Sequence, residues 1–154
     1  MGEKKRQRRA ALNEVIEGKV YQRGCFQSWT RKKKDQILSE NNIGLVVNLW
    51  TKIDPEVCND VYRTYLHFPM KGNIPPTPDM LDAIIHLIRV HLYEGVAVLI
   101  HGEAGVNRSQ FLAACMVAEI NVVSGEEALA HLANGTWSVK VNKNLRQFII
   151  DRYQ

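Results

Sequence analysis

Short apolar runs alternate along this chain with longer segments in which apolar positions recur every three or four residues. Continuous aliphatic runs are typical of buried strands, and the longer spacing is typical of amphipathic helices. The apolar runs predict strands over residues 43–49 and 96–101, and the more polar segments 19–23 and 62–68 are further strand candidates. The periodic segments predict helices over residues 29–40, 78–94, 109–122, 125–133 and 143–153. This alternation predicts an α/β fold, with a central, mostly parallel, twisted sheet and helices on both faces.

The predicted helix over residues 78–94 has a clear beginning and end. Thr77 can cap its first turn, Pro78 suits its first position, and the helix dipole favours Asp79 in that turn. Gly95 can end the helix, because glycine adopts the left-handed conformation without strain. We therefore assign Asp79 a structural role.

One strand–loop–helix unit has the form of an anion-binding site. The apolar run 96–100 predicts a buried parallel strand, and Ser109 is placed to cap the helix that follows the loop. Unpaired backbone NH groups and the positive end of the helix dipole would converge on that loop. Arg108 can hold two phosphate oxygens at once with its planar guanidinium. The sequence therefore predicts a phosphate cradle here.

The same loop carries a motif. His-Cys-x-x-Gly-x-x-Arg-Ser is the signature of the protein tyrosine phosphatase superfamily, and His101, Gly105, Arg108 and Ser109 match it. Gly102 stands where the signature has cysteine. Over residues 15–154 the chain resembles the dual-specificity phosphatase branch of that superfamily. The resemblance implies a dual-specificity-phosphatase-like fold.

The resemblance also implies that a catalytic part is missing. In this family the cysteine thiolate attacks phosphorus and forms a covalent phosphoenzyme. Gly102 has no atom that could attack, and removing the nucleophile of a hydrolase costs on the order of a millionfold in turnover. The chain thus resembles a catalytically inactive pseudophosphatase, and inactive relatives with glycine at this position exist.

A second catalytic residue of the family, the general acid, is absent as well. Active relatives carry a general-acid aspartate about thirty residues before the cysteine, where this chain has Met70 and Lys71, neither of them acidic. The RNA 5′-triphosphatase branch of the superfamily works without this aspartate and often has asparagine before the arginine, as Asn107 is here. On that alternative only the cysteine is missing.

The resemblance assigns phosphate binding to the loop that remains, with His101 structuring it. Losing the thiolate removes a negative charge that faces the phosphate, whereas glycine gives the loop more freedom to lose on binding. The sequence leaves open which of these two effects on phosphate affinity is larger. The residues expected to contact phosphate are Glu103, Ala104, Gly105, Val106, Asn107, Arg108 and Ser109.

Two other interpretations of the loop are weaker. A nucleotide-binding P-loop would want glycine at position 107 and lysine at position 108, and the chain has neither. A turn that merely joins strand to helix would not explain why His101 and Arg108 flank it.

Length and composition indicate one ordinary domain. We expect a flexible basic arm over residues 1–12 and a single domain over residues 13–154. No apolar stretch approaches membrane-spanning length, and no signal peptide is apparent at the start. Cys25, Cys58 and Cys115 have neither metal-site spacing nor an even count for disulfides, which favours a reducing, intracellular compartment, the cytoplasm and also the nucleus. Cys115 is expected in the core and Cys58 at the surface.

Basic residues are unevenly distributed. Clusters of this kind bind nucleic acid or acidic surfaces, act as nuclear import signals, or are simply solvated. Trp29 beside the second cluster suggests a stacking surface. The clusters comprise Lys4, Lys5, Arg6, Arg8 and Arg9, and Arg31, Lys32, Lys33 and Lys34.

Together these features predict a non-hydrolysing domain that binds phosphorylated proteins or acts as a scaffold in a phosphatase or kinase pathway. One alternative is an active dual-specificity phosphatase or RNA 5′-triphosphatase whose cysteine has been substituted. Another is an RNA or polyanion binder that uses the basic arm. No cofactor or metal is expected, and His86, His91 and His131 are assigned to helix surfaces because their spacing does not suit a metal site.

Overall fold

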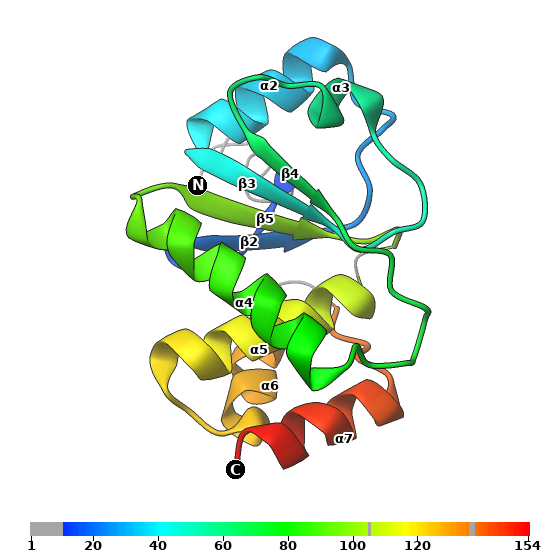
Figure 1. Cartoon of the computed structure of the whole chain (residues 1–154), viewed down its shortest axis with the longest axis vertical. Coiled ribbons are helices and arrows are strands. Elements are labelled where there is room, and N and C mark those ends of the chain that lie inside the picture. Colours follow the sequence, from blue (N-terminus) through cyan, green and yellow to red (C-terminus); the bar gives the residue numbers. More distant parts are fainter. Residues whose placement is uncertain (1–10, 105, 136–137) are drawn as a thin grey trace.

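The computed structural model describes residues 11–104, 106–135 and 138–154, and it contains a five-stranded sheet in the order β1-β2-β5-β3-β4 (Figure 1). β1 pairs with β2 in antiparallel fashion, and the other neighbours are parallel. The four predicted strands are confirmed, and β1 was not predicted. The strands are β1 (Asn13–Ile16), β2 (Val20–Arg23), β3 (Ile43–Asn48), β4 (Thr64–His67) and β5 (Ala97–His101).

Helices cover both faces of this sheet, as predicted. In Figure 1, α2 and α3 lie above the sheet, and α4 to α7 lie below it. All five predicted helices are present with ends shifted by at most two residues, and the short α3 was not predicted. The helices are α2 (Arg31–Glu40), α3 (Pro55–Cys58), α4 (Pro78–Tyr93), α5 (Arg108–Asn121), α6 (Gly125–Ala133) and α7 (Lys143–Arg152).

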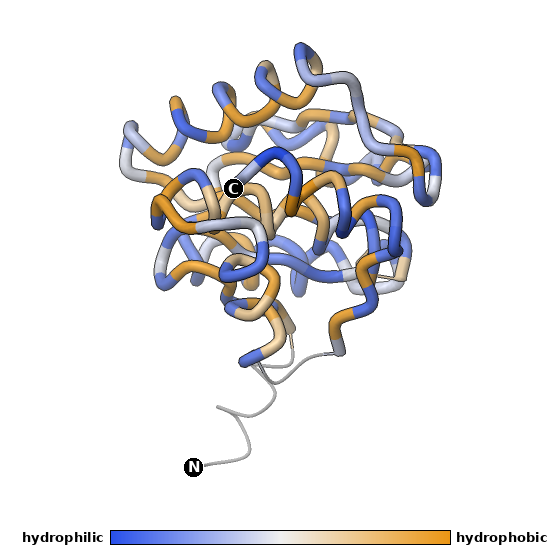
Figure 2. Tube along the Cα trace, turned by 90° about the horizontal axis from the view of Figure 1, so that it is seen from below, coloured by the Kyte–Doolittle hydropathy of each residue, from blue (hydrophilic) through white to orange (hydrophobic). Residues whose placement is uncertain are grey.

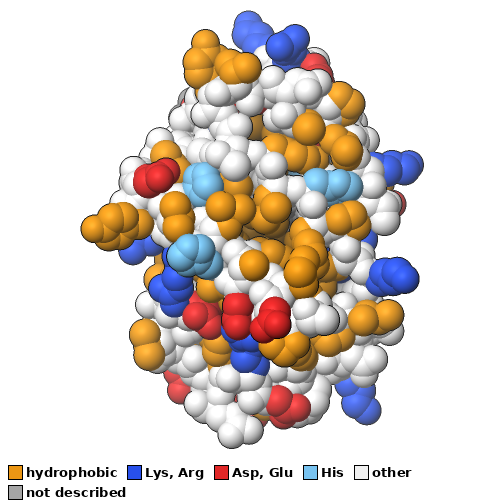
Figure 3. Space-filling view, in the orientation of Figure 1, with side chains coloured by type: hydrophobic (Ala, Val, Ile, Leu, Met, Phe, Trp, Pro, Cys, Tyr) orange, Lys and Arg blue, Asp and Glu red, His pale blue; other side chains and the backbone are white. Residues whose placement is uncertain are grey.

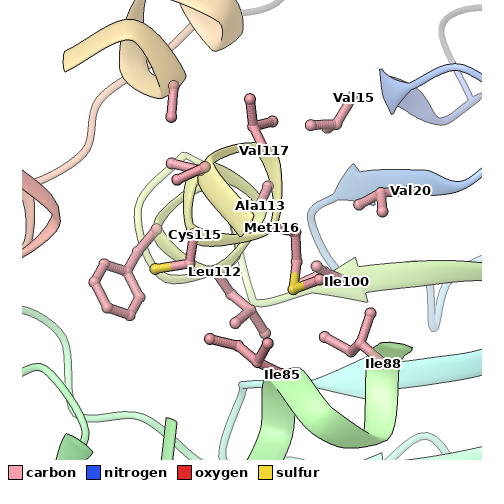
Figure 4. Packing of buried hydrophobic residues seen from close by; sticks show 14 of the residues in the cluster. Val15, Val20, Ile85, Ile88, Ile100, Leu112, Ala113, Cys115, Met116 and Val117 are labelled. Atoms are coloured by element: carbon pink, nitrogen blue, oxygen red, sulfur yellow. The ribbon is translucent and has the colours of Figure 1, made fainter. Parts of the chain in front are cut away.

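The larger core is built around α5. Ten of its fourteen residues are buried, so α5 is a central helix and not a surface helix. Figure 4 shows it surrounded by side chains from β1, β2, β5 and α4, among them Val20, Ile85 and Ile100. Along the outer helices, hydrophobic and hydrophilic segments alternate, which gives each helix one apolar face (Figure 2). Cys115 is fully buried in this core, which confirms its packing role, and this burial raises the pKa of its thiol to about 12.

The start and end of α4 are as predicted. Thr77 Oγ1 accepts a hydrogen bond from Met80 N at 3.4 Å, and Pro78 and Asp79 occupy the first turn. Gly95 follows the helix with a φ of 89°, in the left-handed region that favours glycine. Asp79 therefore belongs to the first turn of α4.

The N-terminal end of the described chain is packed. Ala11 and Leu12, the last two residues of the expected arm, are buried against the face of the sheet that α2 covers. The basic residues of the first cluster, from Lys4 to Arg9, lie outside the described residues. Within the described part of the chain, no helix is both long and apolar enough to span a membrane.

Candidate phosphate-binding site

The parallel strands end at one edge of the sheet, and a pocket of about 250 Å³ opens where β5 leads into α5. Such an edge is the usual place for a ligand in an open α/β sheet. Gly105, which the sequence assigns to the cradle, lies outside the described residues. The pocket is lined by Gly72, Gly102, Glu103, Ala104, Val106, Asn107, Arg108 and Ser109.

Gly102 is buried and leaves space for a side chain. A Cβ atom added to Gly102 would lie 3.9 Å from Arg108 Cβ, Arg108 Nε and Ser109 N, and no described atom outside its chain neighbours would be nearer. These are ordinary van der Waals distances. The added atom would face the first turn of α5, whose leading NH groups have no partner within the helix. Among the described residues, the position of Gly102 thus has room for a Cβ atom.

The prediction that Ser109 caps α5 is wrong. The helix begins one residue earlier than expected, so Asn107 is the N-cap residue and makes no side-chain cap hydrogen bond. Ser109 is fully buried, and its Oγ accepts a hydrogen bond from Gln22 Nε2 at 2.8 Å. Gln22 Oε1 in turn accepts from Asn13 Nδ2 at 2.9 Å. The Ser109 hydroxyl therefore anchors the start of α5 to β2.

The side chain of Arg108 is largely covered by its neighbours. Its Nη1 donates to the carbonyl oxygen of Met70 at 3.1 Å, and its Nη2 lies 3.9 Å from Glu103 Oε2. Only 17% of the Arg108 side chain is exposed. A phosphate that enters the pocket would meet a guanidinium that is oriented by Met70 and partly neutralised by Glu103.

Asn107 ties three segments together. Its Nδ2 donates to the carbonyl oxygen of Gly72 at 3.0 Å, and its Oδ1 accepts from Asn142 N at 2.9 Å. The cradle is thereby joined to the loop before α4 and to the residue that caps α7. The sequence assigned Asn107 only to phosphate contact and did not reveal this bracing role.

The loop before α4 supplies no acid to the pocket. Met70 is 4% exposed and packs in the core, whereas Lys71 is exposed. Gly72, which the sequence did not single out, is the residue of this loop that lines the pocket. Among the described lining residues, Glu103 alone is acidic, and it faces Arg108.

The buried His101 side chain holds the start of the loop through a hydrogen bond to Gly102. Its Nδ1 donates to the carbonyl oxygen of Gly102 at 3.2 Å, and its ring packs edge-on against Phe26 at 5.1 Å between ring centres. Within the described structure, His101 Nε2 is buried without a hydrogen-bond partner. Burial lowers the pKa of His101 to about 4, so its imidazole is neutral near pH 7.

No cysteine lines the described part of the pocket. The backbone NH of Cys25 donates to the carbonyl oxygen of Glu103 at 2.8 Å, which braces the outside of the loop. Gly24 permits this close approach, since a Cβ there would lie 2.7 Å from the same oxygen. Cys58 is exposed on α3, as predicted, and Cys115 is buried in α5.

Another buried polar side chain, that of Gln110, connects the first turn of α5 to the segment before α7. Gln110 Nε2 donates to the carbonyl oxygen of Ser138, and Gln110 Oε1 accepts from Lys140 N at 3.0 Å. The segment that leads into α7 is thus held against α5. No local sequence signal pointed to this contact, because the partners lie 28 and 30 residues away.

The second basic cluster is partly engaged inside the protein. Lys34 is 4% exposed, and its Nζ lies 3.0 Å from Asp54 Oδ2 and 2.8 Å from Glu56 Oε1. Cationic groups of Arg23 and Lys33 lie over the Trp29 ring, at 4.3 and 4.4 Å from its centre. A ring so engaged does not offer a free stacking surface, so the interpretation of Trp29 as a stacking residue is not supported.

The three histidines that the sequence assigns to helix surfaces do not form a metal site with one another. His91 contacts the Leu87 carbonyl and Thr64 Oγ1, and His131 contacts the Val15 carbonyl, whereas His86 is exposed. Over the described ranges, no three His, Cys, Asp or Glu side chains are grouped so that they could hold a metal ion.

Comparisons with known proteins agree with this geometry. A family model described as "Polymorphic toxin system, DSP-PTPase phosphatase" (Tc-R-P) matches residues 24–122, more than half of the chain. The Cydia pomonella PTP-2 phosphatase has 19% identity and a TM-score of 0.77, over 91% of this chain and 88% of its own. The human tyrosine phosphatase-like serine/threonine/tyrosine-interacting protein has 18% identity and a TM-score of 0.77, over 92% of this chain and 94% of its own. No curated protein matches the chain in sequence.

Proposed function

We propose that this chain, which belongs to the Tc-R-P family of DSP-PTPase phosphatases, uses its cradle to bind phosphorylated protein segments without hydrolysing them. The family match and the shared fold place the domain in the dual-specificity branch of the protein tyrosine phosphatase superfamily. The loss of hydrolysis and the binding role are our inference from the residues of the site.

The observation that carries the proposal is that Gly102 stands in a cradle whose other described residues are in place to bind phosphate. Arg108, the first turn of α5 and the room beside Gly102 are all present, while the atom that would attack phosphorus is not. A phosphoenzyme requires a nucleophile within reach of the bound phosphoryl group. Cys25, Cys58 and Cys115 do not line the described pocket, so none of them supports a substitute reaction.

The absence of a general acid also supports the loss of hydrolysis. Protonation of the leaving oxygen needs a carboxylic acid beside it, and Met70, Lys71 and Gly72 offer none. Glu103, the one acidic lining residue, is directed at Arg108. The chain thus lacks both the nucleophile that attacks phosphorus and the general acid that protonates the leaving oxygen. The groups that bind the phosphate in the ground state remain.

Binding in the ground state is favoured by the electrostatics of the site. An active relative holds a thiolate against the incoming phosphate, and this chain holds no charge at position 102. The bidentate guanidinium and the NH groups of α5 still offer strong, charge-assisted donors. One structural relative carries the words "phosphatase-like" and "interacting protein" in its name, which is consistent with a binding role for this fold. The family description further suggests that the phosphorylated partner is a component of a polymorphic toxin system.

Calorimetric titration with phosphotyrosyl and phosphothreonyl peptides tests the proposal, with the unphosphorylated peptides as a reference. We expect binding that requires the phosphate and disappears in Arg108→Ala. The matched control is Arg146→Ala, which removes an exposed arginine from α7 and should leave binding intact. The proposal fails if neither phosphopeptide binds, or if Arg108→Ala binds as well as the natural chain.

A further inference from the structure

Another pocket, here called the distal pocket, lies at the end of α5 that is remote from the cradle. It has a volume of about 550 Å³ and opens between the last turns of α4 and α5. Because α5 has 14 residues and an α-helix rises about 1.5 Å per residue, roughly 20 Å separates the distal pocket from the cradle. Its lining includes the apolar residues Val90, Leu92, Tyr93 and Ile120 and the charged residues Lys19 and Glu94.

Tyr93, the last residue of α4, stands out from the distal pocket instead of filling it. The residue is 94% exposed although it belongs to the lining, and Val90, one turn earlier, is also exposed. In Figure 3, hydrophobic side chains project at the left-hand margin, where Figure 1 places the link from α4 to β5. One surface thus has both a projecting aromatic side chain and an apolar recess, which are the two halves of a self-complementary contact.

The end of α5 exposes a further apolar side chain in a strained backbone conformation. Val122 follows α5 with a φ of 53° and is 87% exposed. Glycine or asparagine is usual in this left-handed region, and a β-branched residue is rare there. Neither the local backbone nor contact with water favours valine at this position, two residues beyond Ile120 of the distal pocket. Contact with another molecule accounts for an apolar side chain here.

The distal pocket also carries one charge of each sign that has no partner among the described residues. Lys19 and Glu94 are exposed, and neither belongs to an ion pair of the described structure. Arg89, by contrast, pairs with Glu119 at 3.1 Å, which joins α4 to α5 and fixes the walls of the pocket. An acidic partner would leave Glu94 unpaired, and a basic partner would leave Lys19 unpaired. A second copy of the same surface, related by a two-fold axis, satisfies both charges.

We propose that a second copy of this chain docks on the distal pocket and forms a dimer with two-fold symmetry. Tyr93 of each copy enters the distal pocket of the other, and Lys19 of each copy pairs with Glu94 of the other. Tyrosine suits this role, because it buries a large apolar area while its hydroxyl group stays at the wet edge of the contact. The dimer goes beyond the proposed function and leaves both cradles open, since they lie at the other end of α5.

Sedimentation equilibrium of the full chain from about 10 μM to about 1 mM tests the dimer, because a small interface gives a Kd in this range. We expect the average mass to rise from 17.6 kDa toward twice that value. Tyr93→Ala should weaken association at least about tenfold. Tyr62→Ala, which removes a similarly exposed tyrosine between α3 and β4, is the matched control and should associate like the natural chain. A mass that stays at 17.6 kDa would overturn the inference and indicate a different occupant, and equal association of the two variants would also overturn it.

Charge exchange tests whether the occupant is a second copy in the proposed arrangement. Lys19→Glu alone and Glu94→Lys alone each place two like-charged pairs in the dimer, so each variant should associate about fivefold more weakly. An equimolar mixture of the two should recover the association, because each copy then supplies the charge that the other needs. Lys32→Glu and Glu126→Lys, exposed residues outside the distal pocket, are the controls and should associate like the natural chain, alone or mixed. A mixture that associates no better than either distal-pocket variant alone would overturn the two-fold pairing.

Discussion

Arg108, the first residue of α5, faces Glu103 in the loop before that helix, with Arg108 Nη2 3.9 Å from Glu103 Oε2. The carboxylate lies where a phosphate would approach the guanidinium, and it competes with the ligand for the same positive charge. Because 61% of the Glu103 side chain is exposed, solvent screens much of this attraction.

Glu103→Gln should therefore tighten phosphopeptide binding modestly, by about two- to fivefold. Calorimetric titration at low and moderate salt measures the effect, which should shrink as salt rises. Glu17→Gln, an exposed glutamate outside the pocket, provides the control and should change nothing. Weaker binding in Glu103→Gln would show that Glu103 helps to hold the ligand.

Asn107→Ala should loosen the loop before α4. The change removes the hydrogen bonds to the Gly72 carbonyl and from the Asn142 NH, which together should cost about 2 kcal/mol of unfolding free energy. Urea unfolding measures the cost, and limited proteolysis should cut the variant faster between residues 71 and 76. Asn144→Ala, an exposed asparagine of α7, is the matched control. Equal proteolysis of the two variants would argue against the bracing role of Asn107.

His101 should make the fold acid-sensitive. Burial lowers its pKa from the ordinary 6.5 to about 4, so between these values the unfolded chain binds a proton that the folded chain does not. Stability must then fall as pH decreases through that window, by at most about 3 kcal/mol near pH 4. Urea unfolding at several pH values should show this slope, and His101→Asn should flatten it. Replacement of the exposed His86 by Asn should leave the slope unchanged; a slope that persists in His101→Asn would assign it to other groups.

Gly102→Cys should restore part of the phosphatase chemistry, because it supplies the nucleophile and its Cβ would meet the described atoms of the first turn of α5 at ordinary contact distance. Without a general acid, the variant should hydrolyse aryl phosphates with good leaving groups such as nitrophenyl phosphate, and phenyl phosphate only slowly. Adding Gly72→Asp, at a position where a Cβ meets no described atom within 4 Å, should selectively raise the rate on phenyl phosphate. Gly102→Ser is the control and should remain inactive. A folded Gly102→Cys variant without turnover would mean that the cradle is not arranged for phosphoryl transfer.

The order of elements could be predicted from the sequence, because long periodic segments and buried runs carry strong signals. β1 and α3 were not predicted. Only one of the four residues of β1 is buried, so this strand gives no apolar run, and α3 has four residues, too few to show the helical spacing. The start of α5 was misplaced by one residue, which led to the wrong role for Ser109. The choice between Asn107 and Ser109 as the cap depends on the contact between Ser109 and Gln22, 87 residues away along the chain.

The motif contains every described lining residue of the pocket except Gly72, but it gives no sign of the residues that support the loop. Gly72, Gln110 and Asn142 hold the loop through partners 28 to 35 residues distant, and short polar residues in loops give no local sign of such contacts. The basic residues at positions 31–34 illustrate the opposite error. They read as one charged surface in the sequence, yet Lys34 is buried against Asp54 and Glu56 in the fold.

The central claim, binding without hydrolysis, can be tested in one experiment by following the phosphorus resonance of a phosphotyrosyl peptide mixed with a slight excess of the protein. We predict that the resonance shifts or broadens on mixing, that Arg108→Ala abolishes the change, and that no inorganic phosphate signal grows with time. An inorganic phosphate signal that appears with the natural chain and is absent with Arg108→Ala would contradict the claim, because it would show that the cradle hydrolyses its ligand despite Gly102.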